Sequence, residues 1–214
     1  MNDDFTLVAV IAGIIIVLIV LIVWMKSRAK RRIVNAVTQA QEVLKLSPFI
    51  GNHPQLDAVW YAARGKVSGL PIKIFGGKSR GRRNPGSIKG TGAMSTAVDS
   101  AYVMIVVSIP NTIPFHIGIQ RKPALSSPSF GTSSPEFDRI VEVITENEKK
   151  TLTLLNNEQL RTAIISFTKK SYANAFITSS EVMIKIYDGK QVLPAVHEAV
   201  NLANIFGQQV ERIR

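Results

Sequence analysis

The chain contains no cysteine in its 214 residues. That absence excludes structural disulfides, zinc or iron–sulfur clusters held by thiolates, and cysteine nucleophiles. Histidine is scarce as well, because His53, His116 and His197 are the only three, and they lie far apart without a shared metal-ligand spacing. We interpret each of them as a surface or structural residue, and the sequence predicts no metal and no cofactor.

Complete nucleotide-binding motifs are missing too. Gly77-Lys78-Ser79 resembles the end of a phosphate-binding loop, but Ile72 stands where the full pattern needs its first glycine. Such a loop also needs a helix directly after it, and the Arg- and Gly-rich sequence that follows is not typical of a helix. A P-loop is therefore not expected.

Two patterns typical of hydrolases are equally incomplete. Residues 77–81 match G-x-S-x-G with Ser79 as the candidate nucleophile, and histidines follow downstream, but the required strand-to-helix turn again lacks its helix. His197 and Glu198 begin an H-E-x-x-H pattern in which Asn201 occupies the place of the second histidine. We predict no catalytic residue and a non-enzymatic protein, with an unrecognised enzyme acting at the membrane as the least favoured alternative.

Acidic residues are scarce in the first half of the chain. The net charge of +11 consists of −2 from residues 1–25, +12 from residues 26–90 and +1 from residues 91–214. A nucleic-acid-binding protein usually concentrates its positive charge on the recognition domain, whereas here the excess follows the N-terminal segment. Nucleic acid is therefore not expected as a partner.

What the sequence does contain is a 21-residue run without a charge, from Phe5 to Met25, in which fifteen positions are Ile, Leu, Val or Phe. At about 1.5 Å per helical residue, this run covers the roughly 30 Å of hydrocarbon in a bilayer. The segment is apolar on every side, so it lacks the amphipathic face of a helix from a soluble protein. It predicts a transmembrane helix over residues 5–25, preceded by an extracytoplasmic tail of residues 1–4.

The charges that flank this run predict its orientation. Asp3 and Asp4 precede it, and five basic residues follow it within seven positions. The positive-inside rule places the basic flank in the cytoplasm, and a cleaved signal peptide would carry its basic residues before a shorter apolar core. We predict a single-pass protein of the cell (inner) membrane, with its N-terminus outside and its domain in the cytoplasm.

Two groups of basic residues are candidates for contact with anionic lipid headgroups. One is the flank just described, and the other is the loop of residues 77–92, which holds five cations, no acid and no aromatic residue that would stack on a nucleic-acid base. The ten candidates are Lys26, Arg28, Lys30, Arg31, Arg32, Lys78, Arg80, Arg82, Arg83 and Lys89. The alternatives are a solvated loop without a ligand and a loop that binds a protein or a nucleic acid, the last disfavoured by the missing aromatic residues.

Periodicity predicts the elements of the first half. Apolar residues at helical spacing extend the membrane helix through residues 26–46 as a basic juxtamembrane extension. A short helix is predicted from Pro54 to Gly65. Residues 101–109 form the strongest predicted strand, with residues 114–120 as its hairpin partner.

The last third predicts the order strand, helix, strand, strand, helix. A strand is expected over residues 137–144, followed by a helix over residues 157–170 that Asn156 caps. A hairpin is expected over residues 174–187, and a terminal helix that starts near Pro194 is expected to pack on the sheet.

These elements indicate an α+β fold, in which one transmembrane helix is followed by a cytoplasmic domain of mostly antiparallel sheet packed with helices. The Ser-, Pro- and Gly-rich residues 123–135 are typical of a linker. They divide the domain into a first α+β subdomain, residues 47–122, and a β-α-β-β-α subdomain, residues 136–214.

Several features stand out between residues 102 and 190. They are a strand that ends at Ile109-Pro110, an aliphatic strand over residues 115–119, Phe137-Asp138 within EFDRIVEV, the pair Leu154-Leu155, and the closing hairpin FITSSEVMIKIYDG. Together they resemble a family of uncharacterised bacterial membrane-anchored proteins. The resemblance implies an α+β cytoplasmic domain without assigned activity or catalytic residues. Members of that family commonly carry two hydrophobic spans, whereas this sequence shows one.

The sequence therefore favours a non-enzymatic, single-pass membrane protein whose cytoplasmic domain docks a partner, either another protein or a further copy of itself, or scaffolds a membrane complex. The alternative is a peripheral, regulatory domain that responds to anionic lipid.

Overall fold

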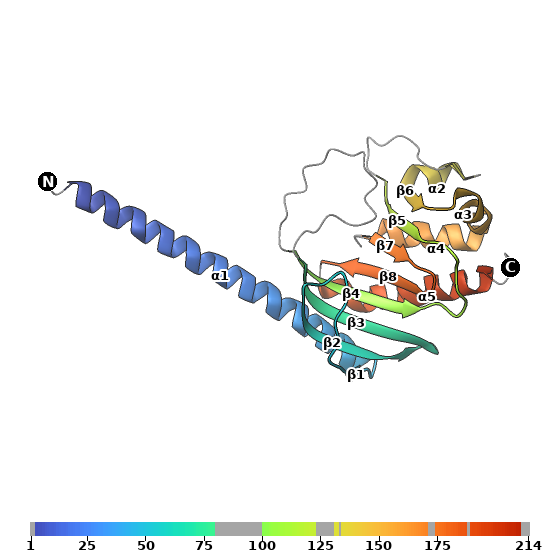
Figure 1. Ribbon diagram of the computed structural model, residues 1–214, viewed down its shortest axis with the longest axis horizontal. Helices are drawn as coiled ribbons and strands as arrows, with labels where there is room; N and C mark the ends of the chain where they lie inside the picture. The colour runs from blue at the N-terminus through green and yellow to red at the C-terminus, as the bar shows by residue number, and fades with distance from the viewer. Residues whose placement is uncertain are drawn as a thin grey trace.

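The structure, a computed structural model, describes residues 3–79, 100–122, 131–132, 134–170, 174–187 and 189–210. It has one long N-terminal helix and a domain in which helices pack against an eight-stranded sheet (Figure 1). All the strand pairs are antiparallel. The α+β class predicted from the sequence is confirmed.

The N-terminal helix α1 runs without a break from Asp3 to Val43. Its residues 11–25 are exposed, and α1 is the one helix in the described part of the chain that is long and apolar enough to cross a membrane. Its last turns instead bury Ile33, Val37 and Ala40, a spacing that places all three on one helical stripe. One helix therefore carries both an exposed apolar run and part of the core of the domain.

The sheet has the strand order β1-β2-β3-β4-β8-β7-β5-β6. The strands are β1 Ser47–Pro48, β2 Ala58–Val67, β3 Leu70–Ser79, β4 Ser100–Ser108, β5 Ile117–Arg121, β6 Val141–Thr145, β7 Asn174–Ile177 and β8 Glu181–Ile186. The remaining helices are α2 Pro135–Ile140, α3 Glu148–Leu155, α4 Glu158–Lys169 and α5 Val192–Val210, the last preceded by the short 3₁₀ helix η1 Gly189–Gln191.

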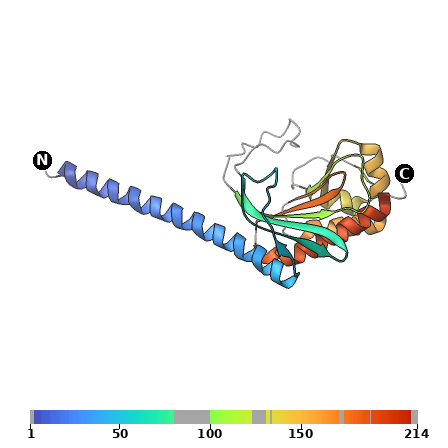
Figure 2. The same cartoon turned by 60° about the horizontal axis from the view of Figure 1, so that its bottom comes forward.

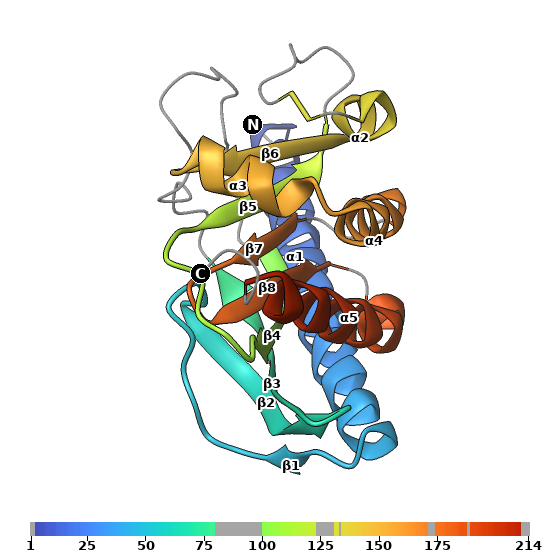
Figure 3. The same cartoon turned by 90° about the vertical axis from the view of Figure 1, so that its right-hand side faces the viewer.

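The helices α1, α4 and α5 lie on one face of the sheet (Figure 3). The end of α1 covers β2 to β4, α5 covers β4 and β8, and α4 covers β5 and β6. The other face carries a smaller apolar cluster, and the segment 49–57 between β1 and β2 folds along it. We call the face of the sheet that carries this smaller cluster the second face. The central strand β4 is almost wholly apolar because both of its faces are buried.

Several predicted elements are confirmed. The strongest predicted strand is β4, and the hairpin predicted over residues 174–187 is formed by β7 and β8. The helix predicted over residues 157–170 is α4, and the terminal helix is α5, which packs on β4 and β8 as expected.

The helix predicted from Pro54 to Gly65 is wrong, because β2 occupies most of that segment. A β-bulge shifts the register between Val59 and Tyr61, and the extra residue interrupts the period of two that marks a strand. Gly65 does not end a helix; an added Cβ there would lie 2.7 Å from the Leu46 side chain, so the glycine permits a close approach.

The predicted pairing of residues 114–120 with β4 is also wrong. These residues include most of β5, but β5 pairs with β6 and β7, and β8 takes the place beside β4. In that pairing Ile184 lies opposite Ile105, within two complementary apolar strands. The segments 47–122 and 136–214 therefore contribute strands to one continuous sheet.

The strand predicted over residues 137–144 begins too early. Pro135 starts the short helix α2, and the Ser134 side chain accepts a hydrogen bond from the Phe137 amide, so β6 begins only at Val141. Helix α3 is not among the elements predicted from the sequence. Asn157, rather than Asn156, caps α4.

Small residues allow α1 to approach the sheet and η1 closely. An added Cβ at Gly76 would lie 2.9 Å from Ile33 Cγ2 and 3.0 Å from Val37 Cγ2. An added Cβ at Gly189 would lie 2.8 Å from the Ala36 Cβ. The Tyr61 hydroxyl also donates a hydrogen bond to the side-chain oxygen of Gln41 on α1. We call this contact between α1 and the domain the seam.

We expect Gly76→Ala to destabilise the seam, because the methyl groups it would meet belong to β-branched side chains that cannot move aside. Overpacking of this kind costs about 1 to 3 kcal/mol. The matched control is Gly118→Ala on β5, where the added Cβ would meet its nearest atom at an ordinary 3.5 Å. Denaturant unfolding in mild detergent measures both variants, and equal losses of stability would contradict the tight seam.

Candidate functional site

The juxtamembrane cations lie on the exposed surface of α1. Lys26, Arg28, Lys30, Arg31 and Arg32 are all exposed. The Arg28 guanidinium carbon lies 5.1 Å from the centre of the Trp24 ring, a cation–π geometry suited to the membrane–water interface. These five side chains surround the helix between the apolar run and the seam.

The second predicted group of cations is described only in part. Lys78 lies near the end of β3, where its carbonyl accepts a hydrogen bond of 2.9 Å from the Asp57 amide. Arg80, Arg82, Arg83 and Lys89 lie outside the described residues. The start of β4, beyond that segment, lies at the side of the domain from which the exposed part of α1 projects (Figures 1 and 2).

The second face of the sheet holds an aromatic and sulfur-rich cluster that β3, β4 and β8 supply. Phe75 pairs with Met104 across β3 and β4, and Met104 pairs with Lys185 across β4 and β8. Phe176 on β7 pairs with Met183 in the neighbouring row. The sheet register therefore places a lysine in the middle of an apolar surface.

The segment 49–57 packs on this cluster. The Phe49 and His53 rings lie 5.5 Å and 5.2 Å from the Phe75 ring, and the Tyr102 hydroxyl donates a hydrogen bond of 2.5 Å to the Gln55 carbonyl. Edge-on and tilted ring contacts and one hydrogen bond therefore fix the segment on the cluster.

Burial shifts the pKa values of two titratable groups in the cluster. Burial lowers the pKa of Lys185, whose Nζ lies 5.5 Å from the Tyr102 ring centre and 5.8 Å from the Phe176 ring centre. Burial also raises the pKa of Tyr102 to about 12, although a hydrogen bond with Ser79 opposes the shift. Among the ion pairs of the described residues, none includes Lys185, so the aromatic rings are its main favourable contacts.

His53 is held in its neutral form. Its Nδ1 accepts a hydrogen bond of 3.2 Å from the Gln55 amide, which a protonated imidazole cannot do. Burial lowers the pKa of His53, and the positive charges of Lys185 and Lys73 lower it further.

The structure does not bring together Ser79 and His116, two of the candidate catalytic residues considered in the sequence analysis. Ser79 lies at the end of β3, whereas His116 directly precedes β5, four strand spacings away, or about 19 Å. His116 instead contacts Glu146 at 3.4 Å, and His197 is exposed on α5. In the part of the chain that the structure describes, no group of three or more His, Asp or Glu residues could hold a metal ion.

Two open grooves lie on the first strands of the sheet. One, of about 410 Å³, is lined by residues of β2, β3, β4 and β8, including Arg64, Lys66 and Lys73. The other, of about 480 Å³, lies between residues 48–52 and the first half of β2. We call the groove of about 410 Å³ the basic groove. The sequence reading named neither these three cations nor Lys185 as site residues.

The fold and these surfaces define an α+β domain continuous with an exposed apolar helix. Models of known protein families give no match to the chain, and neither do curated proteins. Among solved structures, the crystal structure of the mycobacterial trehalose monomycolate transport factor A, TtfA, is similar. The TM-score is 0.48 and the sequence identity 9%, over 84% of this chain and 93% of that one.

We expect stability to fall on acidification because of His53. The pKa of His53 in the folded protein lies below its value of 6.5 in the unfolded chain. At a pH between these two pKa values the unfolded chain binds more protons than the folded protein, so the free energy of unfolding falls as the pH falls. Above pH 6.5 the contribution is constant. Urea unfolding at about pH 7.5 and about pH 5.5 should show a smaller acid loss for His53→Gln than for the wild type. Equal losses in the two proteins would contradict this assignment.

Proposed function

We propose that the protein is a single-pass membrane protein whose domain docks a protein partner at the membrane surface and so scaffolds a membrane complex. The observation that carries this proposal is the continuity of α1. The same helix presents an exposed apolar run and inserts Ile33, Val37 and Ala40 into the core of the domain.

A continuous helix constrains the domain more than a flexible tether does. From Met25, the end of the apolar run, to Ile33, the first buried residue of the seam, α1 rises about 12 Å. No loop separates the two positions. The domain is therefore held close to the bilayer at a fixed height and a fixed rotation about the helix axis, which suits a docking platform.

The proposed topology has the N-terminus outside and the domain in the cytoplasm. It is supported by the five cations that follow the apolar run and by their exposure on α1, which leaves them accessible to headgroups and water. We propose a role without catalysis, because Ser79 ends β3 and His116 directly precedes β5, and these two strands lie about 19 Å apart in the sheet.

Insertions in α1 test whether the fixed rotation matters. Two alanines inserted between Ser27 and Arg28 rotate the domain by about 200°, whereas four rotate it by only about 40° beyond a full turn. Alanine maintains the helix. We expect native electrophoresis of membranes in mild detergent to show loss of the complex with the two-residue insertion and retention with the four-residue insertion.

The four-residue insertion is the matched control, because it displaces the domain farther from the bilayer but nearly restores its rotation. Identical behaviour of the two insertions, or a wild-type chain that migrates as a lone monomer, would contradict a rotationally fixed docking platform.

A second candidate function is a response to anionic lipid. The observation in its favour is the exposed ring of cations between the apolar run and the seam. Each basic residue near an anionic leaflet contributes on the order of 1 kcal/mol, and salt weakens the attraction.

We expect a chain that begins at Lys26, which retains the seam, to float with liposomes that contain phosphatidylglycerol and not with pure phosphatidylcholine. Replacement of Arg28, Lys30, Arg31 and Arg32 by Gln should abolish most of that binding, because each loses about 1 kcal/mol of attraction. Replacement of Lys149, Lys150, Lys169 and Lys190 by Gln removes the same charge elsewhere on the domain and is the control. Binding that ignores lipid charge and salt would exclude the lipid response.

A further inference from the structure

We propose that the basic groove binds an extended, acidic segment of a soluble partner protein. This inference deepens the proposed docking function and rests on it, because the proposed membrane topology determines which way the groove faces. It rests on the charges of the groove, the spacing of its cations and its height above the membrane.

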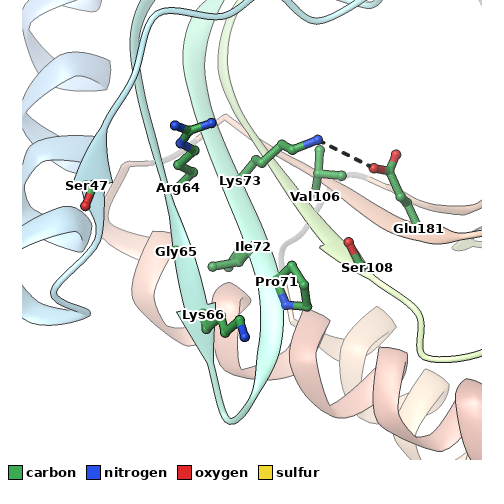
Figure 4. A pocket seen from close by; sticks show the side chains of 10 residues that line it. All are labelled: Ser47, Arg64, Gly65, Lys66, Pro71, Ile72, Lys73, Val106, Ser108 and Glu181. Atoms are coloured by element: carbon green, nitrogen blue, oxygen red, sulfur yellow. Dashed lines mark ion pairs between the residues drawn. The ribbon is translucent and has the colours of Figure 1, made fainter.

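The cations of the groove gather on two neighbouring strands. Arg64 and Lys66 lie on β2 and Lys73 lies on β3, all three are exposed, and Figure 4 shows Lys73 reaching toward Glu181 of β8. The Lys73 Nζ to Glu181 distance is 4.0 Å, at the limit of an ion pair. Glu181 is the one acid among the described residues that line the groove. The groove therefore carries an excess of positive charge.

The sheet register places two of these cations opposite each other. Arg64 and Lys73 are directly opposed in the β2–β3 pair, and like charges at such positions repel each other because their Cβ atoms lie only about 5 Å apart. The Arg64 guanidinium also packs at 5.4 Å from the Phe49 ring centre, which holds it beside the groove. A bound carboxylate would relieve the repulsion between the two strands.

The spacing of the cations fits an extended polypeptide. Arg64 and Lys66 are two residues apart on one strand and face the same side, so they are separated by about 6.7 Å. Carboxylates on alternate residues of an extended peptide have the same spacing. Pro71 and Val106 add apolar surface to the lining of the groove. The match points to a segment with acids at every second position.

The height of the groove separates it from the lipid headgroups. Arg64 pairs with Ser47, just beyond the end of α1 at Val43. From Met25 to Val43 the helix rises about 27 Å, or roughly three Debye lengths at physiological salt. Figures 1 and 2 show the β2–β3 turn on the side of the domain opposite the exposed part of α1. A soluble partner, rather than the anchoring bilayer, can reach this groove.

Binding to full-length protein in phosphatidylcholine nanodiscs tests the proposal. The probe is a fluorescein-labelled peptide of alternating Glu and Ser, about ten residues long, whose anisotropy is followed by titration at low salt. Matched probes are the Gln-Ser peptide and a thymidine oligonucleotide of similar length. We expect Arg64→Gln/Lys73→Gln to weaken binding of the Glu-Ser peptide by about three- to tenfold, as loss of two exposed charge contacts implies.

The control Lys149→Gln/Lys150→Gln removes the same charge from the exposed surface of α3, at the other end of the sheet from β2 and β3, and should change the affinity by less than about twofold. Lys66→Gln, a single change near an exposed turn, should also weaken binding, which protects the test against a double variant that misfolds. The proposal is overturned if wild-type protein does not bind the peptide, if the Gln-Ser peptide or the oligonucleotide binds as well, or if both double variants lose affinity equally. Displacement by inorganic phosphate at constant ionic strength would also overturn it, in favour of a small-anion site.

An experiment can distinguish an error in the proposed groove ligand from an error in the proposed membrane anchoring. If carbonate washing releases the wild-type chain from membranes, the membrane anchoring in the proposed function is wrong. Peptide binding that still depends on Arg64 and Lys73 in the released protein would then leave the groove's ligand class intact. A retained chain that fails to bind the peptide would remove only the present inference.

Discussion

The rest of the structure depends on the seam, where the last turns of α1 pack on β2 to β4. Full burial of an aliphatic side chain stabilises a fold by about 1.5 to 3 kcal/mol, and Ile33 and Val37 are both buried there. Gly76 is the residue that lets their methyl groups reach the sheet. Because the seam belongs to the same helix as the exposed apolar run, a local packing contact sets the position of the whole domain relative to that run.

The parts of the fold that the sequence predicts well are those with local causes. The buried stretch of β4, the β7–β8 hairpin and α5 each have a regular apolar pattern. Errors arise where a non-local contact decides. The bulge near Val59 disguises β2, and the place beside β4 goes to β8 although β5 is nearer in sequence. Strands that are neighbours in the sequence usually pair in a sheet. The observed order could have been predicted only by recognising that β8, although distant in the chain, is complementary to β4.

The candidate sites follow the same division. Charge counting identifies the juxtamembrane cations, because they adjoin the apolar run. It does not identify Lys185, Arg64 or Lys73, since their significance depends on the sheet register. Lys185 alternates with apolar residues, a pattern equally typical of a solvent-facing lysine, and only the Tyr102 and Phe176 rings place it in a partly buried setting. Arg64 and Lys73 become a like-charged pair once the β2–β3 hairpin aligns them.

The positive charge of the domain gives a physical reason for α1 to continue into it as one rigid helix, without a flexible linker. A domain with an excess of cations, joined to an anionic bilayer by a flexible segment, would rotate until its basic surfaces met the headgroups. The basic groove would then be covered by lipid. In the proposed orientation the seam would prevent this, because it keeps Arg64 beside Ser47, just beyond the end of α1 at Val43, which is about 27 Å along the helix from the end of the apolar run. The cations near Arg28 stay close to that run. In the proposed arrangement the same helix separates two positively charged surfaces, the juxtamembrane cations proposed to meet lipid and the basic groove proposed to bind a soluble partner.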